Sequence, residues 1–219
     1  MKIKFLAHSS FLITTTNNTK IIFDPYKSQS FSGSLGYKPI KEEADIVLVS
    51  HQHDDHNGIT EVLGKPEVIK DTGIWTLKDI KITGIAAYHD SQRGKARGQN
   101  IIFVVDTDGL RIAHLGDLGH SLNQEEIAQL GEIDVLFSPV GGFFTIDAKV
   151  ATEVFKSLNP KILIPMHYKT QVLDFPIAKV DEFLKDKKNV KKIDSSEIEI
   201  NKNTLPKTPE IWVLKMAKE

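Results

Sequence analysis

The stretch from Val49 to Gly58, "VSHQHDDHNG", concentrates side chains that bind metal ions. It places three histidines and two aspartates within six positions, and the chain contains no cysteine. Imidazole nitrogens and carboxylate oxygens are the ligands from which a site without thiolates is built. The residue types and their spacing therefore favour a metal site over a polar loop whose histidines lie in water.

His51 and His53 follow the apolar run "IVLV" and are two positions apart. Alternate side chains of an extended backbone point to the same side, so we expect both imidazoles to reach one ion. Asp55 and His56 come next, before the expected start of a short helix, where the chain changes direction. They are expected to face a second ion, about 3.5–4 Å from the first.

Further ligand candidates end three other apolar segments. His89 closes "GIAAYH", Asp117 lies in "HLGDLGH" and His167 closes "LIPMH". A single histidine at a strand end is ordinary, but four apolar segments that all end in ligand-type residues are hard to attribute to chance. We therefore expect the strand ends to meet and form one site.

Apolar segments typical of strands alternate with three segments of helical periodicity. The expected strands are 2–8, 10–16, 20–25, 45–51, 81–89, 100–107, 110–117, 134–140, 161–167 and 209–216. The expected helices are 123–130, 148–158 and 177–185, with Ser121 or Asn123 and Asp147 as N-caps. "TTTNNTK" is expected to turn a hairpin between the second and third strands, and the Ser- and Gly-rich segment 28–37 to form a mobile loop flanking the site.

Length and composition limit the classes of protein. The 219 residues show no repeat or linker, so we expect a single domain over 1–219. With 40% hydrophobic residues and a net charge of −1, the chain is neither disordered nor generally attractive to nucleic acid or membranes. The basic stretch from Lys185 to Lys192 is expected to be a solvated helix end and loop. No apolar run approaches a signal-peptide core or a membrane span, so we expect a cytoplasmic protein.

The order of these motifs resembles the metallo-β-lactamase superfamily, over most of the chain from Asp24 to His167. The resemblance implies an α+β fold, an αββα four-layer sandwich, with a two-metal site along one edge of its sheets. It implies that one metal is bound by His51, His53 and His89, the other by Asp55, His56 and His167, and that Asp117 bridges them. Asp24 would support the ligand loop without binding metal.

Within that superfamily, "AHSSFLI", "FDP", "HLGDLGH", "PVGGFFTID" and "IPMHY" look like the small hydrolase branch that includes L-ascorbate-6-phosphate lactonase. The expected activity is that of a metal-dependent hydrolase with a metal-bridging hydroxide, acting on a small anionic substrate of lactone or phosphodiester type. Zn or Mn is the expected pair of ions, and Ni or Fe would also suit the ligands. Asp117, Asp55 and His8 are the expected catalytic residues, with His8 either transferring a proton or supporting the site.

Two segments are candidates for substrate binding. Arg93 and Arg97 lie among glycines in "DSQRGKARGQN" and would donate hydrogen bonds to an anionic group, unless this segment is a solvated hairpin tip. Phe144 and Thr145 in "GGFFTID" would line the pocket, unless the aromatic residues only join the core. The roles of His114 and His120 stay open between core, support and surface.

Three other functions fit the same ligand pattern. They are a diiron oxygen-reducing or oxygen-sensing protein, a nuclease of the superfamily, and a binding protein that holds metal without catalysis. The related flavodiiron pattern has a carboxylate where this chain has His53, and no spare length or basic surface for nucleic acid is evident. The expected partner is a small-molecule substrate, with neither nucleic acid nor membrane, and a homo-oligomer is compatible with the sequence.

Overall fold

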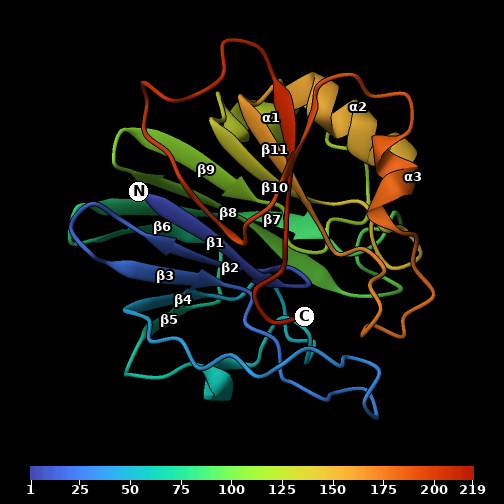
Figure 1. Ribbon diagram of the computed structural model, residues 1–219, viewed down its shortest axis with the longest axis horizontal. Coiled ribbons are helices and arrows are strands. Elements are labelled where there is room, and N and C mark those ends of the chain that lie inside the picture. The colour runs from blue at the N-terminus through green and yellow to red at the C-terminus, as the bar shows by residue number, and fades with distance from the viewer.

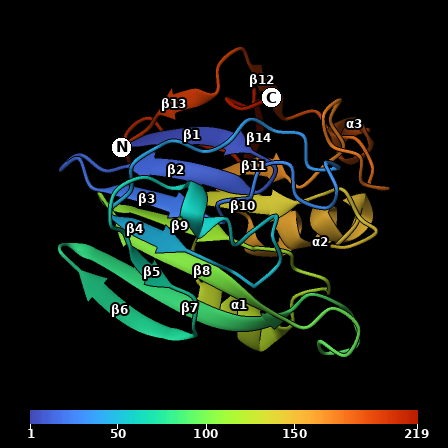
Figure 2. The same ribbon diagram turned by 90° about the horizontal axis from the view of Figure 1, so that it is seen from below.

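Two β-sheets pack face to face in the computed structural model, which describes residues 1–219 (Figure 1). The six-stranded sheet consists, in spatial order, of β13 (Glu197–Glu199), β1 (Lys2–Ala7), β2 (Ser10–Thr14), β3 (Lys20–Phe23), β4 (Ile46–Leu48) and β5 (Glu67–Ile69). The eight-stranded sheet consists of β12 (Val190–Ile193), β14 (Glu210–Leu214), β11 (Ile162–Met166), β10 (Val135–Pro139), β9 (Leu110–His114), β8 (Gln99–Thr107), β7 (Ile80–Tyr88) and β6 (Gly73–Leu77). Figure 2 shows β13 beside β1, although these strands come from opposite ends of the chain.

Three α-helices and one 3₁₀ helix complete the secondary structure. The α-helices are α1 (Gln124–Leu130), α2 (Ala148–Leu158) and α3 (Val180–Leu184), and the 3₁₀ helix is η1 (Ile59–Glu61). The predicted caps of the first two are confirmed: Asn123 forms a capping box with Glu126, and the Asp147 carboxylate accepts the Val150 N–H at 2.9 Å. None of the helices has the length and apolar character that a membrane crossing needs.

A column of stacked aromatic rings joins the two sheets. Phe5 of β1 stacks on Phe11 of β2 at 4.5 Å between ring centroids, and Phe11 stacks on Phe137 of β10 at 3.9 Å. All three side chains are fully buried. Because β1 and β2 belong to one sheet and β10 to the other, this column is the centre of the inter-sheet core.

Replacing Phe11 with Ala is expected to lower the free energy of unfolding by about 3–5 kcal/mol, because it opens a cavity between two stacked rings. Ile74, which is 69% exposed on β6, is the matched control, and its replacement by Ala should change stability by less than about 0.5 kcal/mol. Denaturant unfolding of the two variants measures the difference. Equal stabilities would contradict the central position of the column.

The outer face of the six-stranded sheet is covered by irregular chain. A second buried cluster joins Leu12, Ile22 and Val47 of this sheet to residues of the segments that follow β3 and β11, among them Tyr37 and Leu173. No residue of the three α-helices belongs to it, since these helices pack on the side of β10 and β11 (Figure 1). The predicted α+β sandwich is confirmed, with η1 and loops as its outer layer on this side.

Some predicted elements were wrong. The sequence did not reveal β5, β6, β12 and β13, and β12 takes up residues 190–192 of the basic stretch expected to be helix end and loop. The third helix covers residues 180–184 only, rather than 177–185. The strand expected over 45–51 ends at Leu48, so the first ligand candidates lie outside it.

Candidate metal centre

The loop after β4 folds back on itself and carries four of the predicted ligands. The N–H groups of His56 and Asn57 both donate to the His53 carbonyl at 2.9 Å. The backbone at His51 and His53 is bent rather than extended, and the two ring centroids are 4.6 Å apart. The predicted convergence is therefore present, but its predicted backbone geometry was wrong.

Strands of the other sheet deliver the remaining ligands to the same edge. His89 directly follows β7, Asp117 comes after β9 and His167 directly follows β11. Two groups of ligand atoms result, each with its atoms within 4.8 Å of one another, and a third group, of His51, His56 and Asp117, overlaps both. The first group is His51, His53 and His89, and the second is His8, Asp55, His56 and His167.

Asp117 lies between the two groups. Its Oδ2 is 3.2 Å from His89 Nε2 in the first group and 3.3 Å from His167 Nε2 in the second. Its Oδ1 is 3.1 Å from His56 Nε2. The structure thus brings all seven predicted ligands together and adds His8 to the second group.

The donor set fits metal ions. Asp24, Asp55 and Asp117 are buried, and every ion-pair partner of these carboxylates is a histidine, with no lysine or arginine among them. The buried Nε2 atoms of His51, His56 and His167 have no hydrogen-bond partner. Buried polar atoms are rarely left unpaired, and bound cations would satisfy both the nitrogens and the carboxylates.

Asp24 and Ser50 orient two of these rings. The Ser50 N–H donates to Asp24 Oδ1 at 2.7 Å and the Ser50 hydroxyl to Asp24 Oδ2 at 2.6 Å. His56 Nδ1 lies 2.7 Å from Asp24 Oδ2, and His51 Nδ1 lies 2.9 Å from Ser50 Oγ. Because Nδ1 of each ring is engaged here, Nε2 is left to face Asp117.

Ser50 and Asn100 of β8 also support the site, although neither was predicted from the sequence. Asn100 holds the chain around Asp117: its Oδ1 accepts the Asp117 N–H and its Nδ2 donates to the Leu115 carbonyl, both at 2.9 Å. Asn100 could have been identified in the sequence as a polar residue within an apolar strand.

His8 and His167 both have left-handed backbone conformations, with φ angles of 55° and 50°. The His167 N–H donates to the His8 carbonyl at 3.0 Å, and the two ring centroids are 4.3 Å apart. Such conformations cost roughly 1–3 kcal/mol in non-glycine residues and cluster at functional sites. The hydrogen bond between the two residues helps to hold both strained turns in place.

The electrostatics of the cluster favour ionised carboxylates. Burial opposes ionisation of Asp117, but the neighbouring His167 and His56 outweigh it and hold the pKa of Asp117 well below its usual range. Burial likewise disfavours charge on His56, yet Asp117, Asp55 and Asp24 raise its pKa well above the ordinary value.

Their surroundings favour the neutral form of two other histidines. Burial and the adjacent His167 lower the pKa of His8 to about 4, and burial and His56 lower that of His51 to about 3. With pKa values this low, both rings favour the neutral form at neutral pH. Neutral imidazole is the form that coordinates metal ions.

A cavity of about 340 Å³ opens beside the cluster. It is lined by Phe31, His53, Asp55, His89, Ala96, Arg97, Asp117, Phe144, His167 and Phe175. Of the expected substrate-binding residues, Arg97 and Phe144 therefore line it. Arg93 is not among the lining residues and is exposed, and Thr145 is also outside the lining, with its hydroxyl directed at the Ile146 carbonyl.

Phe31 and Phe175 were not recognised as pocket residues in the sequence. The signal for Phe31 was its place in the Ser- and Gly-rich segment expected to flank the site.

Neither of the two unassigned histidines joins the ligand groups. His114 is buried, with Nε2 donating to the Ser9 carbonyl at 2.8 Å and Nδ1 accepting the Gly116 N–H at 3.1 Å. His120 accepts the Tyr88 N–H through Nε2 at 3.2 Å. Both therefore support the backbone near the site.

Asp90 organises the loop that carries Arg97. Its carboxylate accepts four backbone N–H groups at 2.7–3.0 Å, those of Gln92, Gly94, Ala96 and Arg97. These bonds favour the ionised form and hold the pKa of Asp90 below its usual value, although burial opposes the shift.

Replacing Asp90 with Ala is expected to free this loop, because four N–H groups lose their acceptor together. Amide hydrogen exchange at residues 92–97 should accelerate by at least about tenfold. The matched control is Lys95→Ala, which alters an exposed side chain of the same loop. Unchanged exchange in the Asp90 variant would contradict the assigned role.

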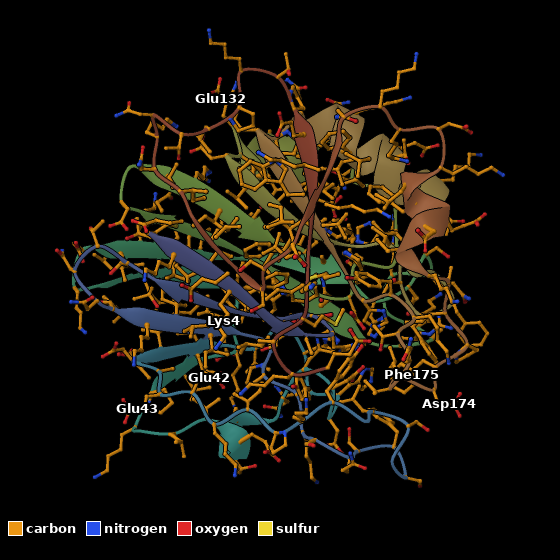
Figure 3. All side chains as sticks on the ribbon, viewed as in Figure 1. Lys4, Glu42, Glu43, Glu132, Asp174 and Phe175 are labelled. Atoms are coloured by element: carbon orange, nitrogen blue, oxygen red, sulfur yellow. The ribbon has the colours of Figure 1, made fainter.

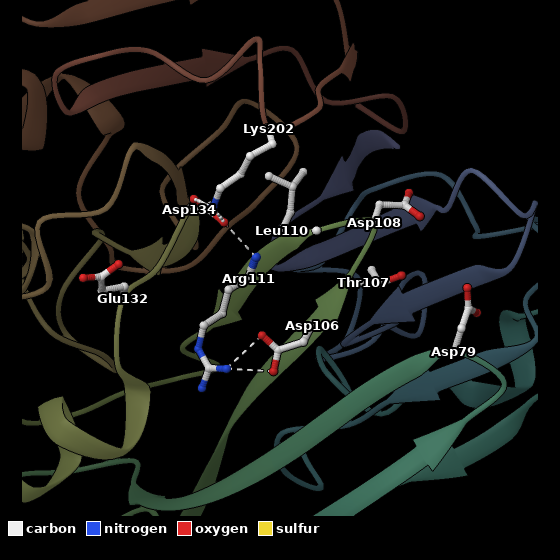
Figure 4. Close-up of a pocket in the computed structure, with 10 residues that line it drawn as sticks. Asp79, Asp106, Thr107, Asp108, Leu110, Arg111, Glu132, Asp134 and Lys202 are labelled. Carbon is white, nitrogen blue, oxygen red and sulfur yellow. Dashed lines mark hydrogen bonds and ion pairs between the residues drawn. The ribbon is translucent and has the colours of Figure 1, made fainter.

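A second hollow of about 390 Å³, near the turn between β8 and β9, is also rich in carboxylates (Figure 4). Both of its cationic side chains are paired with carboxylates of the same hollow. Arg111 binds both oxygens of Asp106 at 2.7 and 2.8 Å, and Lys202 binds both oxygens of Asp134 at 2.9 Å. This hollow contains no histidine, and we assign it a structural role.

The sandwich and the His/Asp cluster at its edge define a metal-dependent hydrolase of the metallo-β-lactamase superfamily, and the family model described as the beta-lactamase superfamily domain matches residues 2–167. A metal-dependent hydrolase of Thermococcus onnurineus is 30% identical over 195 residues, which cover 78% of this chain and 85% of that protein. One of Nanoarchaeum equitans is 32% identical and covers 84% and 89%. A structure from Thermotoga maritima, described as a candidate Zn-dependent hydrolase, has a TM-score of 0.80 and 35% identity, and covers 98% of both chains. The chain belongs to the UPF0173 family of metal-dependent hydrolases.

Proposed function

We propose that the protein is a dinuclear metal-dependent hydrolase that acts on a small anionic substrate. The observation that carries the proposal is the position of Asp117, whose oxygens lie 3.1–3.3 Å from histidine nitrogens of both ligand groups. One ion would be held by His51, His53 and His89, and the other by Asp55, His56 and His167. Asp117 would be shared between them.

Two divalent ions held by these residues, Zn or Mn by preference, would supply a hydroxide at neutral pH and would polarise the bond that is cut. The contribution of the chain is to orient the ligands and to shape the cavity. Asp24 and Ser50 fix the rings of His56 and His51, so that their Nε2 atoms point at the shared carboxylate.

His8 is assigned a positioning role. Its Nε2 lies 3.2 Å from Asp55 Oδ2, and the residue does not line the cavity, whereas Asp55 does. A neutral ring that donates its Nε2–H would fix the Asp55 carboxylate against the pocket. Burial opposes ionisation of Asp55, but His56 and His8 outweigh it and keep the pKa of Asp55 below its usual range, so the carboxylate is held ionised at the wall of the cavity.

The anionic character of the substrate is inferred from Arg97, the one cationic side chain that lines the cavity apart from its histidines. An anionic lactone is supported by the likeness of several segments to the branch that includes L-ascorbate-6-phosphate lactonase. A phosphodiester carries its charge at the bond that is cut and fits the same features.

The test is to measure metal content and hydrolysis on the same preparation. Purified protein should hold about two ions per chain and should cleave bis-p-nitrophenyl phosphate or a member of a lactone panel. Removal of metal by a chelator should abolish this activity, and Zn or Mn should restore it. Failure to bind metal after reconstitution would overturn the proposal, and one ion per chain at saturation would overturn its dinuclear part. Oxygen consumption by iron-loaded protein without hydrolysis would favour the diiron alternative.

A further inference from the structure

Three phenylalanines from distant segments form one wall of the cavity. Phe31 follows β3, Phe144 follows β10 and Phe175 follows β11, where it is labelled in Figure 3. The Phe175 ring meets Phe31 at 5.3 Å and Phe144 at 5.7 Å between centroids, both in edge-to-face geometry. Phe175 is buried, whereas Phe31 is 46% exposed. An apolar surface therefore continues from the interior to the mouth of the cavity.

Backbone hydrogen bonds tie the three segments together. The Gly36 N–H donates to the Val172 carbonyl at 2.8 Å, and the Asp174 N–H donates to the Ser34 carbonyl at 2.7 Å. The Ala178 N–H donates to the Gly141 carbonyl at 2.8 Å. The wall is therefore preformed, and a ligand that binds it does not have to order it first.

Phe31 adopts a conformation that aromatic residues rarely take. Its φ angle is 53°, in a left-handed turn that also includes Ser32, and its ring stays partly in water. Both features are unfavourable for a residue that serves only to fill the core. A bound ligand that covers the ring would offset the cost of its exposure and of its strained backbone.

Arg97 stands at the rim of this wall. Its guanidinium carbon is 5.6 Å from the Phe144 ring centroid, and none of the ion pairs of the chain involves Arg97. Stacking on Phe144 and the hydrogen bonds that its loop donates to Asp90 hold it in place. Its charge is consequently free for an anion that lies against the aromatic wall.

Resting on the proposed hydrolase function, we propose that the substrate carries an aromatic ring next to the bond that is cut, together with an anionic group. The ring packs among Phe31, Phe144 and Phe175, and Arg97 binds the anion. At about 340 Å³ the cavity is at the lower end of the usual range for small-molecule sites, which suits a substrate with one ring.

The test compares two probes that differ only in the ring, phenylphosphonate and methylphosphonate, by calorimetric titration of the metal-loaded protein. Phenylphosphonate should bind at least about tenfold more tightly, because only it covers the apolar wall. Phe31→Ala and Phe144→Ala should reduce this preference to less than about threefold. Ile74→Ala, remote from the cavity, should leave it unchanged.

Arg97→Gln should weaken phenylphosphonate about tenfold, while Lys95→Gln, in the same loop, should not. Equal binding of the two probes, or no binding of either, would overturn the aromatic site. Full affinity in the Arg97 variant would overturn the role of that residue.

Metal content, measured in parallel, separates this inference from the proposed function. Two bound ions without preference for the phenyl probe would support the proposed hydrolase and would overturn the aromatic substrate. Preference for phenyl in a protein that binds no metal would overturn the hydrolase, and with it the substrate, and would leave a binding site for an aromatic anion.

Discussion

Asp117→Asn is expected to lower kcat/KM by at least about 100-fold and to lower the metal content of the purified protein. Mutation of a residue that only supports a metal ligand typically lowers metal affinity or activity by about 10–100-fold. A larger effect is expected for Asp117, which contacts histidines of both groups. The asparagine keeps the volume and removes the charge that both ions would share. Steady-state kinetics and metal analysis of the same samples measure the two effects.

The matched control for this substitution is Asp71→Asn, which changes an exposed carboxylate that forms no ion pair. It should retain wild-type activity and metal content. Circular dichroism should show that both variants are folded. Full activity in the Asp117 variant would refute the shared position of this carboxylate between two ions.

Asp24→Ala is expected to lower both stability and metal affinity. The buried carboxylate is the acceptor for the Ser50 N–H, the Ser50 hydroxyl and the His56 ring, and all three lose their partner. Removing one member of a buried, hydrogen-bonded pair costs about 3–5 kcal/mol, and loss of a supporting group costs about 10–100-fold in metal affinity. Denaturant unfolding and competition with a metal indicator measure these quantities.

Ser50→Ala is the graded comparison for this prediction. It removes only the hydroxyl and leaves Asp24 with the Ser50 N–H and His56, so it should cost about 1–2 kcal/mol. A larger loss of stability for Ser50→Ala than for Asp24→Ala would show that the carboxylate is not the centre of this network.

The elements missed by the sequence analysis are the four edge strands. β13 and β5 bound the smaller sheet, and β12 and β6 bound the larger one. β5 exposes Glu67 and Val68, so apolar periodicity could not identify it. The interior strands were predicted because their apolar residues are either continuous, as in β10 and β11, or recur at alternate positions, as in β7. An edge strand forms because its neighbour offers unpaired backbone groups.

The site was predicted where ligand-type residues end apolar strands, as at His89, Asp117 and His167. Supporting residues could not be found in this way. Ser50 resembles an ordinary turn residue and Asn100 a polar position on a strand, and only their three-dimensional partners reveal what they hold. Phe175 joins the pocket because its segment pairs with residues 34–36, a contact that no local pattern encodes.

The ligands also come from both sheets, and this has a mechanical consequence for a chain that has no cysteine. A pair of ions bridged by Asp117 would cross-link the loop after β4 to the end of β11, joining His51 to His167, about 116 positions along the chain. Closing a loop of about that length by a disulfide removes roughly 4.7 kcal/mol of chain entropy from the unfolded state. The ions would thus link the two sheets at this edge of the sandwich. The ligand bonds that hold the ions for hydrolysis would also keep the two sheets from separating.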